Sequence, residues 1–326
     1  MQILLDEKKP YYKANLHCHS ILSDGKMTVE ELKTAYMQQG YSVVAFTDHE
    51  HLIDNSYLND ENFLAITACE VAIKEFPEQS TLVNMAMRVC HLNFYALDPH
   101  NTITPCYEKV YDHYVNEHNA HLIRYEKEYK RRYDKDGVNE MIRIANEQGF
   151  IVSYNHPTWS LEDASRYLQY ENLWAVEIHN TSCAKVGMLT DEHALDDFLR
   201  ADKPIFCTAA DDNHQKADMF GGWVQINAPA LTYANIMTAL QKGNFYASTG
   251  VDVYSLVRDG NEVTIRTSPC KQITLTTKGR RVSTVRAEEN ETICQATFAL
   301  RETDGHFRIR ATDEKGRSAY TQAYSI

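Results

Sequence analysis

The sequence predicts an α/β fold, with a β/α barrel over residues 1–250 followed by a small C-terminal antiparallel β-sandwich over residues 251–326. Short apolar runs alternate with helical stretches up to about residue 250, an order that favours a largely parallel sheet. About seven such runs occur there, which suits a barrel. Beyond residue 250 the runs alternate polar with apolar residues and are separated by turn pairs such as Asp259-Gly260, a pattern typical of antiparallel sandwiches.

The predicted strands are short, apolar and rich in β-branched and aromatic residues, as expected of strands covered on both faces. They are residues 13–18, 43–48, 64–69, 89–95, 150–155, 174–179 and 205–210. An open, doubly wound sheet fits the same alternation. However, the sequence contains neither GxGxxG nor a P-loop motif, so no glycine-rich phosphate loop supports that alternative.

Helices are predicted between several of these strands. Residues 28–39 begin with a Thr-x-x-Glu capping box and end before a glycine, and residues 232–242 are bounded in a similar way. The charged segment 107–148 is rich in helix formers and is predicted to break at Asp136-Gly137. The alternation of strand and helix therefore covers most of the first 250 residues.

Composition limits the partners. The chain has 326 residues, 43% hydrophobic and 24% charged, with a formal net charge of -12, so no broad basic footprint for long nucleic acid is expected. A small anionic substrate is still compatible, because bound cations reverse the local field. The sequence shows no signal peptide and no long apolar run, which predicts a cytoplasmic protein with no membrane partner.

Histidines and carboxylates recur at the ends of the predicted strands. His17 and His19 are two residues apart, so both imidazoles point to the same side of a strand. A single histidine is more often a core residue than a ligand, and it is the recurrence at strand ends that predicts a site. In a barrel these ends meet at one mouth, which would gather His17, His19, Asp24, His49, Glu70, His91, His156, Asp212 and His214. Nine ligands suit two or three divalent ions, and the mixed nitrogen and oxygen set favours Zn, Mn or Fe over Ca.

The same residues carry a resemblance to a known family. The segments NLHCHS with the following SDG, then FTDHE, ACE, CHLNFYAL, NHP and ADDNH, resemble in order the motifs of the PHP (polymerase and histidinol phosphatase) family over about residues 11–250. This resemblance implies a distorted seven-stranded β/α barrel and up to three metals. It implies one metal on His17, His19, Glu70 and Asp212, a second on Glu70, His91 and His156, and a third on Asp24, His49 and His214, with Glu70 as the bridging ligand. Asp24 stands where some members of the family carry His.

The expected activity is metal-dependent hydrolysis of a phosphomonoester or phosphodiester of a small molecule, such as a nucleotide. A water that bridges the metals, with its pKa lowered to about 7, is the expected nucleophile. His179 and His51 lie near strand ends and are predicted to contact the substrate. Asp48 is predicted to orient a ligand through a hydrogen bond, and Asp211 is predicted either to do the same or to be solvated.

Two other functions fit parts of the sequence. An amidohydrolase-type C–N hydrolase also carries His-x-His after its first strand, so this pair does not decide between them. Glu70 and the Asp212-x-His214 pair favour the phosphoesterase. A non-catalytic metal-binding or ligand-binding protein is the other alternative, although structural sites rarely need so many ligands.

Overall fold

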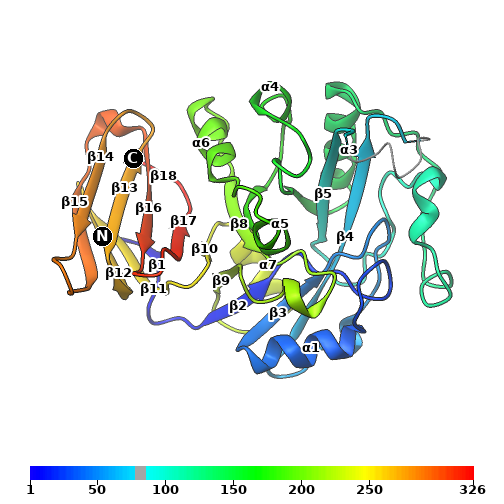
Figure 1. Ribbon diagram of the computed structural model, residues 1–326, viewed down its shortest axis with the longest axis horizontal. Coiled ribbons are helices and arrows are strands. Elements are labelled where there is room, and N and C mark those ends of the chain that lie inside the picture. Colours follow the sequence, from blue (N-terminus) through cyan, green and yellow to red (C-terminus); the bar gives the residue numbers. More distant parts are fainter. Residues whose placement is uncertain (78–85) are drawn as a thin grey trace.

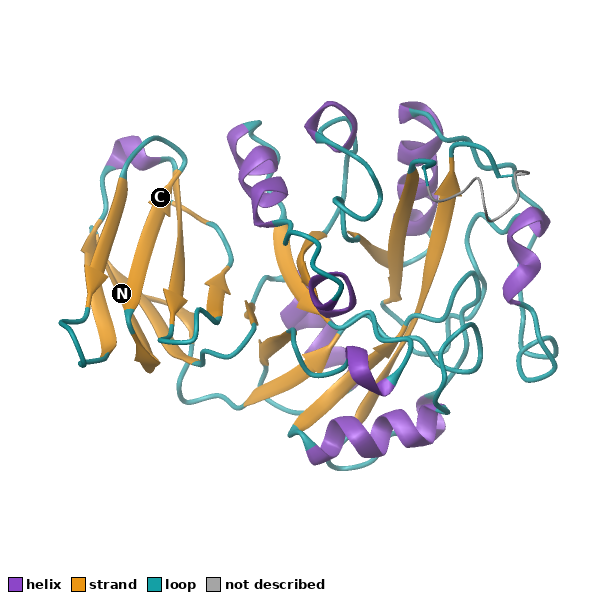
Figure 2. Cartoon of the chain, viewed as in Figure 1, coloured by secondary structure: helices purple, strands orange, loops and turns teal. Residues whose placement is uncertain are grey.

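The computed structural model describes residues 1–77 and 86–326. Figure 1 shows two parts side by side, a larger α/β part and a smaller β part that contains both chain termini. Figure 2 shows that helices are concentrated in the larger part and strands dominate the smaller one. The predicted α/β class is confirmed, since the strands form one large mixed sheet and a second sheet of four strands.

All seven predicted strands of the larger part form, each within a few residues of its expected bounds. They are β2 (Tyr11–Asn15), β3 (Tyr41–Phe46), β4 (Leu64–Lys74), β5 (Val89–Ala96), β6 (Phe150–Tyr154), β7 (Ala175–Asn180) and β8 (Phe206–Ala210). Most residues of these strands are buried, because the sheet is covered on both faces; the first three residues of β2 are only partly buried. The local apolar pattern was therefore sufficient to locate them.

The strand order is β9-β2-β3-β4-β5-β6-β7-β8, where β9 is Trp223–Asn227. The pairs β2/β3, β3/β4, β6/β7 and β7/β8 are parallel, as predicted. The prediction is wrong for β5, which is antiparallel to both β4 and β6. Because β5 runs in the opposite direction, its first residues, rather than its last, lie at the same edge as the carboxyl ends of its neighbours.

The residues that follow the carboxyl ends of β2 and β8 meet at this edge. The N–H of Asp212 donates to the carbonyl of His17 over 2.9 Å, and the N–H of His19 donates to the carbonyl of Asn213 over 3.1 Å. These bonds belong to an isolated parallel bridge between Cys18 and Asn213 and not to a regular ladder. The closed seven-stranded barrel therefore stays a prediction, but the first and last of the seven strands touch at the end that carries the predicted ligands.

The first predicted helix is confirmed as α1 (Val29–Gln38), and its capping box is formed by Thr28 and Glu31. The other α-helices of the described residues are α3 (Lys135–Glu147), α4 (Ala164–Tyr167), α5 (Thr181–Lys185), α6 (Glu192–Arg200) and α7 (Tyr233–Gln241). The short 3-10 helices there are η1 (Ser56–Leu58), η2 (Lys109–Tyr114), η3 (Lys216–Asp218) and η4 (Glu302–Asp304). The break predicted at Asp136-Gly137 is wrong.

Helix α3 begins where that break was predicted. The Asp134 side chain accepts from the N–H of Gly137 over 2.7 Å and so satisfies one of the free donors at the helix start. Residue 137, in the first turn, has to be glycine, since a Cβ there would come within 2.4 Å of the Arg132 carbonyl oxygen. The preceding residues, apart from η2, form loops. One link from these loops to the sheet is buried, where Arg131 pairs with Glu50 at 2.6 Å.

The smaller part is antiparallel throughout its described pairings. One sheet consists of β1 (Gln2–Leu5), β11 (Val253–Asp259), β12 (Glu262–Cys270) and β15 (Ile293–Ala299). The large sheet continues through β10 (Phe245–Ser248) into β17 (Ser318–Thr321), β16 (His306–Thr312), β13 (Gln272–Thr277) and β14 (Val282–Arg286). Strand β18 (Tyr324–Ser325) lies beside β16. Strand β1 lies in the range assigned to the barrel but pairs with β11. Apolar residues of both sheets share one core. The C-terminal sandwich and the domain boundary at residue 250 stay predictions.

The two parts are joined by buried polar contacts. Arg308 of β16 pairs with Asp196 at 2.7 Å and with Glu192 at 3.2 Å, both on α6. The Gln322 side chain bonds to both the N–H and the carbonyl of Cys207 in β8.

Among the described helices, none combines the length and the apolar character needed to cross a bilayer.

Candidate metal centre

The structure brings all nine predicted ligand side chains to one edge of the large sheet. They follow β2 (His17, His19 and Asp24), follow β3 (His49), lie within β4 and β5 (Glu70 and His91), follow β6 (His156) and follow β8 (Asp212 and His214). His91 reaches this edge because β5 is antiparallel and the third residue of the strand lies near its beginning. The convergence was predicted, but the strand direction that places His91 was not.

Glu70 is the centre of the cluster. Its side chain is 1% exposed, and its two oxygens lie within 3.5 Å of nitrogens on five imidazoles. Oε1 lies 3.0 Å from His91, 3.3 Å from His17 and 3.3 Å from His156. Oε2 lies 3.2 Å from His49 and 3.5 Å from His19. A carboxylate with one oxygen facing three imidazoles and the other facing two is arranged to bridge two cations.

Asp212 closes the cluster from the side of β8. Its Oδ1 lies 3.0 Å from His19 Nε2 and 3.2 Å from His17 Nε2, and its Oδ2 lies 3.8 Å from His156 Nε2. The residue has a positive φ of 50°, an uncommon conformation outside glycine. The hydrogen bond between its N–H and the His17 carbonyl holds it there, so the meeting of β2 and β8 directly sets the position of this carboxylate.

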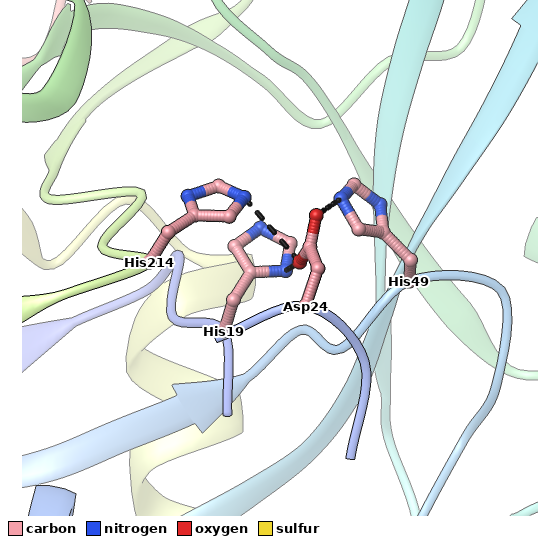
Figure 3. A group of neighbouring side chains, drawn as sticks. All are labelled: His19, Asp24, His49 and His214. Carbon is pink, nitrogen blue, oxygen red and sulfur yellow. Dashed lines mark ion pairs between the residues drawn. The ribbon is translucent and has the colours of Figure 1, made fainter. Parts of the chain in front are cut away.

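Asp24 is the centre of a second group, shown in Figure 3. Its oxygens lie 3.4 Å from His214 Nε2, 3.6 Å from His49 Nε2 and 3.8 Å from His19 Nδ1. The loop that carries Asp24 is tight, because a Cβ at Gly25 would come within 2.5 Å of the His19 carbonyl oxygen. Asp24 is more exposed than Glu70, with 39% of its side chain accessible, so this group forms the outer part of the cluster.

The side chains fit metal ions by geometry and by donor chemistry. The nine predicted ligands form three groups in which the potential ligand atoms lie within 4.8 Å of one another, namely His17 with His19, Glu70 and Asp212; Glu70 with His91 and His156; and His19 with Asp24, His49 and His214. A fourth group of the same kind consists of His17, His156 and Glu177. Within the described residues, several buried ligand atoms have no hydrogen-bond partner, among them His17 Nε2, both ring nitrogens of His19, His49 Nδ1, His91 Nδ1 and Asp212 Oδ1. Buried polar atoms are rarely left unpaired, and cations would satisfy these.

The electrostatics of the cluster also favour cations. Burial raises the pKa of Glu70, but His91 and His17 outweigh it and hold that pKa well below its usual range. Burial lowers the pKa of His214, but the hydrogen bond to Asp24 and the charge of Asp212 raise it to about 9. Burial, together with the neighbouring His214 and His49, lowers the pKa of His19 to about 4. Glu70 is thus held ionised, which favours a cation beside it, and His19 is held neutral, the form in which an imidazole binds a metal.

Glu177 is a functional residue that the sequence did not reveal. Its Oε1 lies 3.0 Å from His17 Nδ1, and its Oε2 accepts the N–H of His156 over 3.1 Å. Asn180 donates both to Glu177 and to Asp212, over 3.0 and 2.9 Å, and Asn155 donates to Glu70 over 2.8 Å. The available signal was a single carboxylate inside an apolar strand, since Glu177 is 2% exposed within β7.

Asp48 and Asp211 hold the loops of the site, while their expected role in orienting ligands stays a prediction. Asp48 accepts from the N–H and the hydroxyl of Ser20, each over 2.8 Å, and from the hydroxyl of Ser23 over 2.7 Å. It therefore fixes the turn between His19 and Asp24. Asp211 accepts three consecutive backbone N–H groups, from Phe220 to Gly222, and the hydroxyl of Tyr36 over 2.9 Å.

His179 and His51 lie outside the three ligand groups. The bulge in β7 between Glu177 and His179 turns Asn180 towards Asp212. His179 Nε2 lies 3.5 Å from the hydroxyl of Thr181, beside Gly222. His51 is buried, with its ring 6.3 Å from that of Tyr107. Their contact with substrate stays a prediction.

Two aromatic rings border the cluster. Tyr114 of η2 stacks on His49, with ring centroids 4.3 Å apart and an interplanar angle of 21°. Trp159 packs against His156 at 4.9 Å and against His91 at 5.1 Å. These contacts restrict the orientation of three imidazoles and leave aromatic surface at the edge of the site.

Comparisons with known proteins give similarities in structure only. No family model matches the chain, and no curated protein matches it by sequence. Among solved structures, the chain is similar to a two-domain protein from Bacteroides vulgatus that contains a predicted PHP-like metal-dependent phosphoesterase, with 14% identity, a TM-score of 0.48 and coverage of 100% of this chain and 97% of that one.

Two further solved structures are similar over most of their own length. One, from Bifidobacterium adolescentis, is named a candidate metal-dependent phosphoesterase, with 17% identity, a TM-score of 0.36 and coverage of 63% of this chain and 89% of that one. The other is an amidohydrolase from Chromobacterium violaceum, with 10% identity, a TM-score of 0.37 and coverage of 71% and 96%. Because all three TM-scores are below 0.5, the function of this chain is inferred from the geometry of its own site.

Proposed function

We propose that this chain hydrolyses phosphate esters with divalent metal ions held at the mouth of a distorted seven-stranded barrel, beside a C-terminal β-sandwich. The observation that carries the proposal is the position of Glu70, a buried carboxylate within 3.5 Å of five imidazoles. Such a group without cations would leave buried nitrogens unpaired, which costs folding free energy.

The three groups of potential ligands support three ions. The first would be held by His17, His19, Glu70 and Asp212, the second by Glu70, His91 and His156, and the third by Asp24, His49 and His214. Glu70 belongs to the first two sets and would bridge them. His19 belongs to the first set and is also grouped with the three residues of the third set. Mixed imidazole and carboxylate donors are typical of Zn, Mn or Fe.

Charge supports an anionic substrate at this site. Two or three divalent ions carry about +4 to +6, while the ligand carboxylates Asp24, Glu70 and Asp212 contribute three negative charges. The local field would thus be positive in a protein of net charge -12, which suits a phosphate group. When bound, the ions would supply Lewis acidity and a water whose pKa is lowered towards neutrality.

Among the described residues, the hydroxyls and the thiol that lie nearest in sequence to His17 and His19 are engaged in other contacts or buried, and the Ser160 hydroxyl contacts Nδ1 of His156 over 3.3 Å. The hydroxyls of Ser20 and Ser23 both donate to Asp48, and Cys18 is fully buried, with a pKa that burial raises well above its usual value. Glu177 fixes the ring of His17, and Asn180 fixes Asp212. These contacts favour hydrolysis by water over a covalent intermediate on the protein.

The test is a panel of phosphomonoesters and phosphodiesters, assayed after loading with Mn, Zn or Fe and after metal content has been measured. We expect turnover of at least one class of ester. His17→Ala and His19→Ala should abolish it, whereas His100→Ala, at a histidine whose side chain is 75% exposed, should leave it unchanged. Absence of turnover by the metal-loaded protein would contradict the proposal, and hydrolysis of amides in its place would support a C–N hydrolase.

A further inference from the structure

Trp159 presents an unusual amount of aromatic surface beside the candidate metal centre. The residue is 42% exposed, whereas Trp174 is 9% exposed. Its ring nevertheless packs against His156 and His91, with centroid separations of 4.9 and 5.1 Å. The indole therefore touches two potential metal ligands while much of its surface stays exposed.

The loop that carries Trp159 is held firmly in place. The N–H and the hydroxyl of Thr158 both donate to Asp191, over 3.0 and 2.5 Å. The N–H of Ser160 donates to the His156 carbonyl over 3.1 Å, and the Ser160 carbonyl accepts the N–H of Val89 in β5 over 3.2 Å. A ring fixed in this way loses little conformational entropy when a ligand packs on it.

The loop that carries Trp159 and the loop that follows α5 both expose apolar side chains. Leu161, two residues after Trp159, is 50% exposed, and in the loop that follows α5 Val186, Met188 and Leu189 are 75%, 40% and 79% exposed. The bond between Thr158 and Asp191 ties the two loops together. Clusters of exposed apolar side chains beside a polar site commonly mark a ligand-binding surface.

We propose that Trp159 binds the planar aromatic group of the substrate by stacking, so that the preferred substrates are phosphate esters of alcohols that carry an aromatic ring. This inference rests on the proposed phosphoesterase function. A phosphate at the group formed by Glu70, His91 and His156 would place the attached alcohol next to the indole, because two of these ligands touch it. Stacking accepts any planar ring, so the ring can be a nucleobase or an aryl group.

The kinetic test compares three phosphomonoesters: a nucleoside 5′-monophosphate, 4-nitrophenyl phosphate and glycerol phosphate. In Trp159→Ala we expect the ratio of kcat/KM for the aromatic esters to kcat/KM for glycerol phosphate to fall about tenfold or more; the ratio is compared because loss of the contacts to His156 and His91 lowers turnover of all three esters alike. Trp159→Phe should retain most of the preference. The control is Tyr254→Ala, which removes an aromatic ring of similar exposure, 44%, from β11 in the other part of the molecule.

The binding test uses tryptophan fluorescence and does not depend on turnover. Titration with the nucleoside monophosphate should quench the emission of the wild-type protein and of Tyr254→Ala, and the quench should be lost in Trp159→Phe. Quenching by the nucleotide alone points to a base as the natural ring, whereas quenching by 4-nitrophenyl phosphate alone, after correction for its absorbance, points to an aryl group.

The outcomes separate the two proposals. If the wild-type protein hydrolyses no ester, the phosphoesterase function fails. If it hydrolyses esters but Trp159→Ala keeps the same ratio of aromatic to aliphatic kcat/KM, the stacking inference is overturned. It is also overturned if the exposed loops bind phospholipid vesicles, with Trp159→Ala weakening that binding and leaving the ester preference intact.

Discussion

Glu177 Oε1 lies 3.0 Å from Nδ1 of His17, and this contact directs the opposite nitrogen, Nε2, towards Glu70 and Asp212 at 3.3 and 3.2 Å. A carboxylate that accepts from one imidazole nitrogen fixes the tautomer and leaves the other nitrogen free to bind a metal. The second oxygen of Glu177 holds the backbone of His156. One buried carboxylate thus orients two parts of the cluster.

We expect Glu177→Gln to lower the apparent metal affinity by about 10- to 100-fold, the range usual for the loss of such an orienting partner. Glutamine has the same shape, so the fold should be retained. Calorimetric titration of the metal-free protein with Zn or Mn measures the change. Glu171→Gln, at an exposed position, is the control, and equal affinities in the two variants would show that Glu177 does not orient a ligand.

The group around Asp24 predicts a change in metal stoichiometry. Because its carboxylate is the only one in the ligand set of the outer group, Asp24→Ala should reduce the bound metal from three ions per chain to two. Elemental analysis after gel filtration counts the ions. Loss of all bound metal in this variant would mean that the groups do not act as separate sites.

Replacing Asp24 with another ligand is the matched control. Asp24→His should retain three ions, because the imidazole offers one nitrogen where the carboxylate offered its oxygens. The affinity at the outer site can change, but the stoichiometry should not. An Asp24→His protein with only two ions would show that the tight loop at Gly25 does not allow the longer side chain to reach the cluster.

Metal removal should destabilise the folded protein. A ligand that binds only the native state adds about 2.7 kcal/mol when its concentration is 100 times its Kd, which corresponds to a rise in Tm on the order of 5 °C. Thermal unfolding of the EDTA-treated protein, with and without added Zn or Mn, measures this. Ca²⁺ prefers all-oxygen sites and should shift the Tm little, so an equal effect of Ca²⁺ would argue against the imidazole-rich site.

The smaller part of the molecule has its own dependence on pH. The hydrogen bond from Arg281, of 2.7 Å between Nε and Oδ1, lowers the pKa of Asp304. Because the folded pKa is below the unfolded value of about 3.9, this stabilisation is present above pH 4 and is lost as the pH falls through the folded pKa. Asp304→Asn should therefore cost about 1–2 kcal/mol at pH 7, and the difference from the wild type should shrink towards pH 3.

Urea unfolding at several pH values measures that difference. Asp259→Asn is the control, since that side chain is 79% exposed and its replacement should change stability by less than about 0.5 kcal/mol. A difference between wild type and Asp304→Asn that stays constant from pH 7 to pH 3 would show that the charge on Asp304 contributes nothing to stability.

The sequence alone determined the positions of the strands and the identity of the nine side chains at the site. Both are local properties, because an apolar run of five to eight residues between turns has few alternatives to a buried strand. A histidine or carboxylate at the end of such a run also needs a partner of its own. For this reason the local pattern around His17, Glu70 and Asp212 was enough to single them out, and the structure brings them together, while their role as metal ligands stays a prediction.

The tertiary structure decided what depends on pairing between distant segments. The direction of β5, which brings His91 to the site from the start of its strand, is set by its two neighbours and not by its own residues. The pairing of β1 with β11 joins residues about 250 positions apart. Glu177 acquired its role only when β7 was placed beside His17. Composition and spacing carry no record of which strand lies next to which, because long-range pairing is selected by the packing of the whole core.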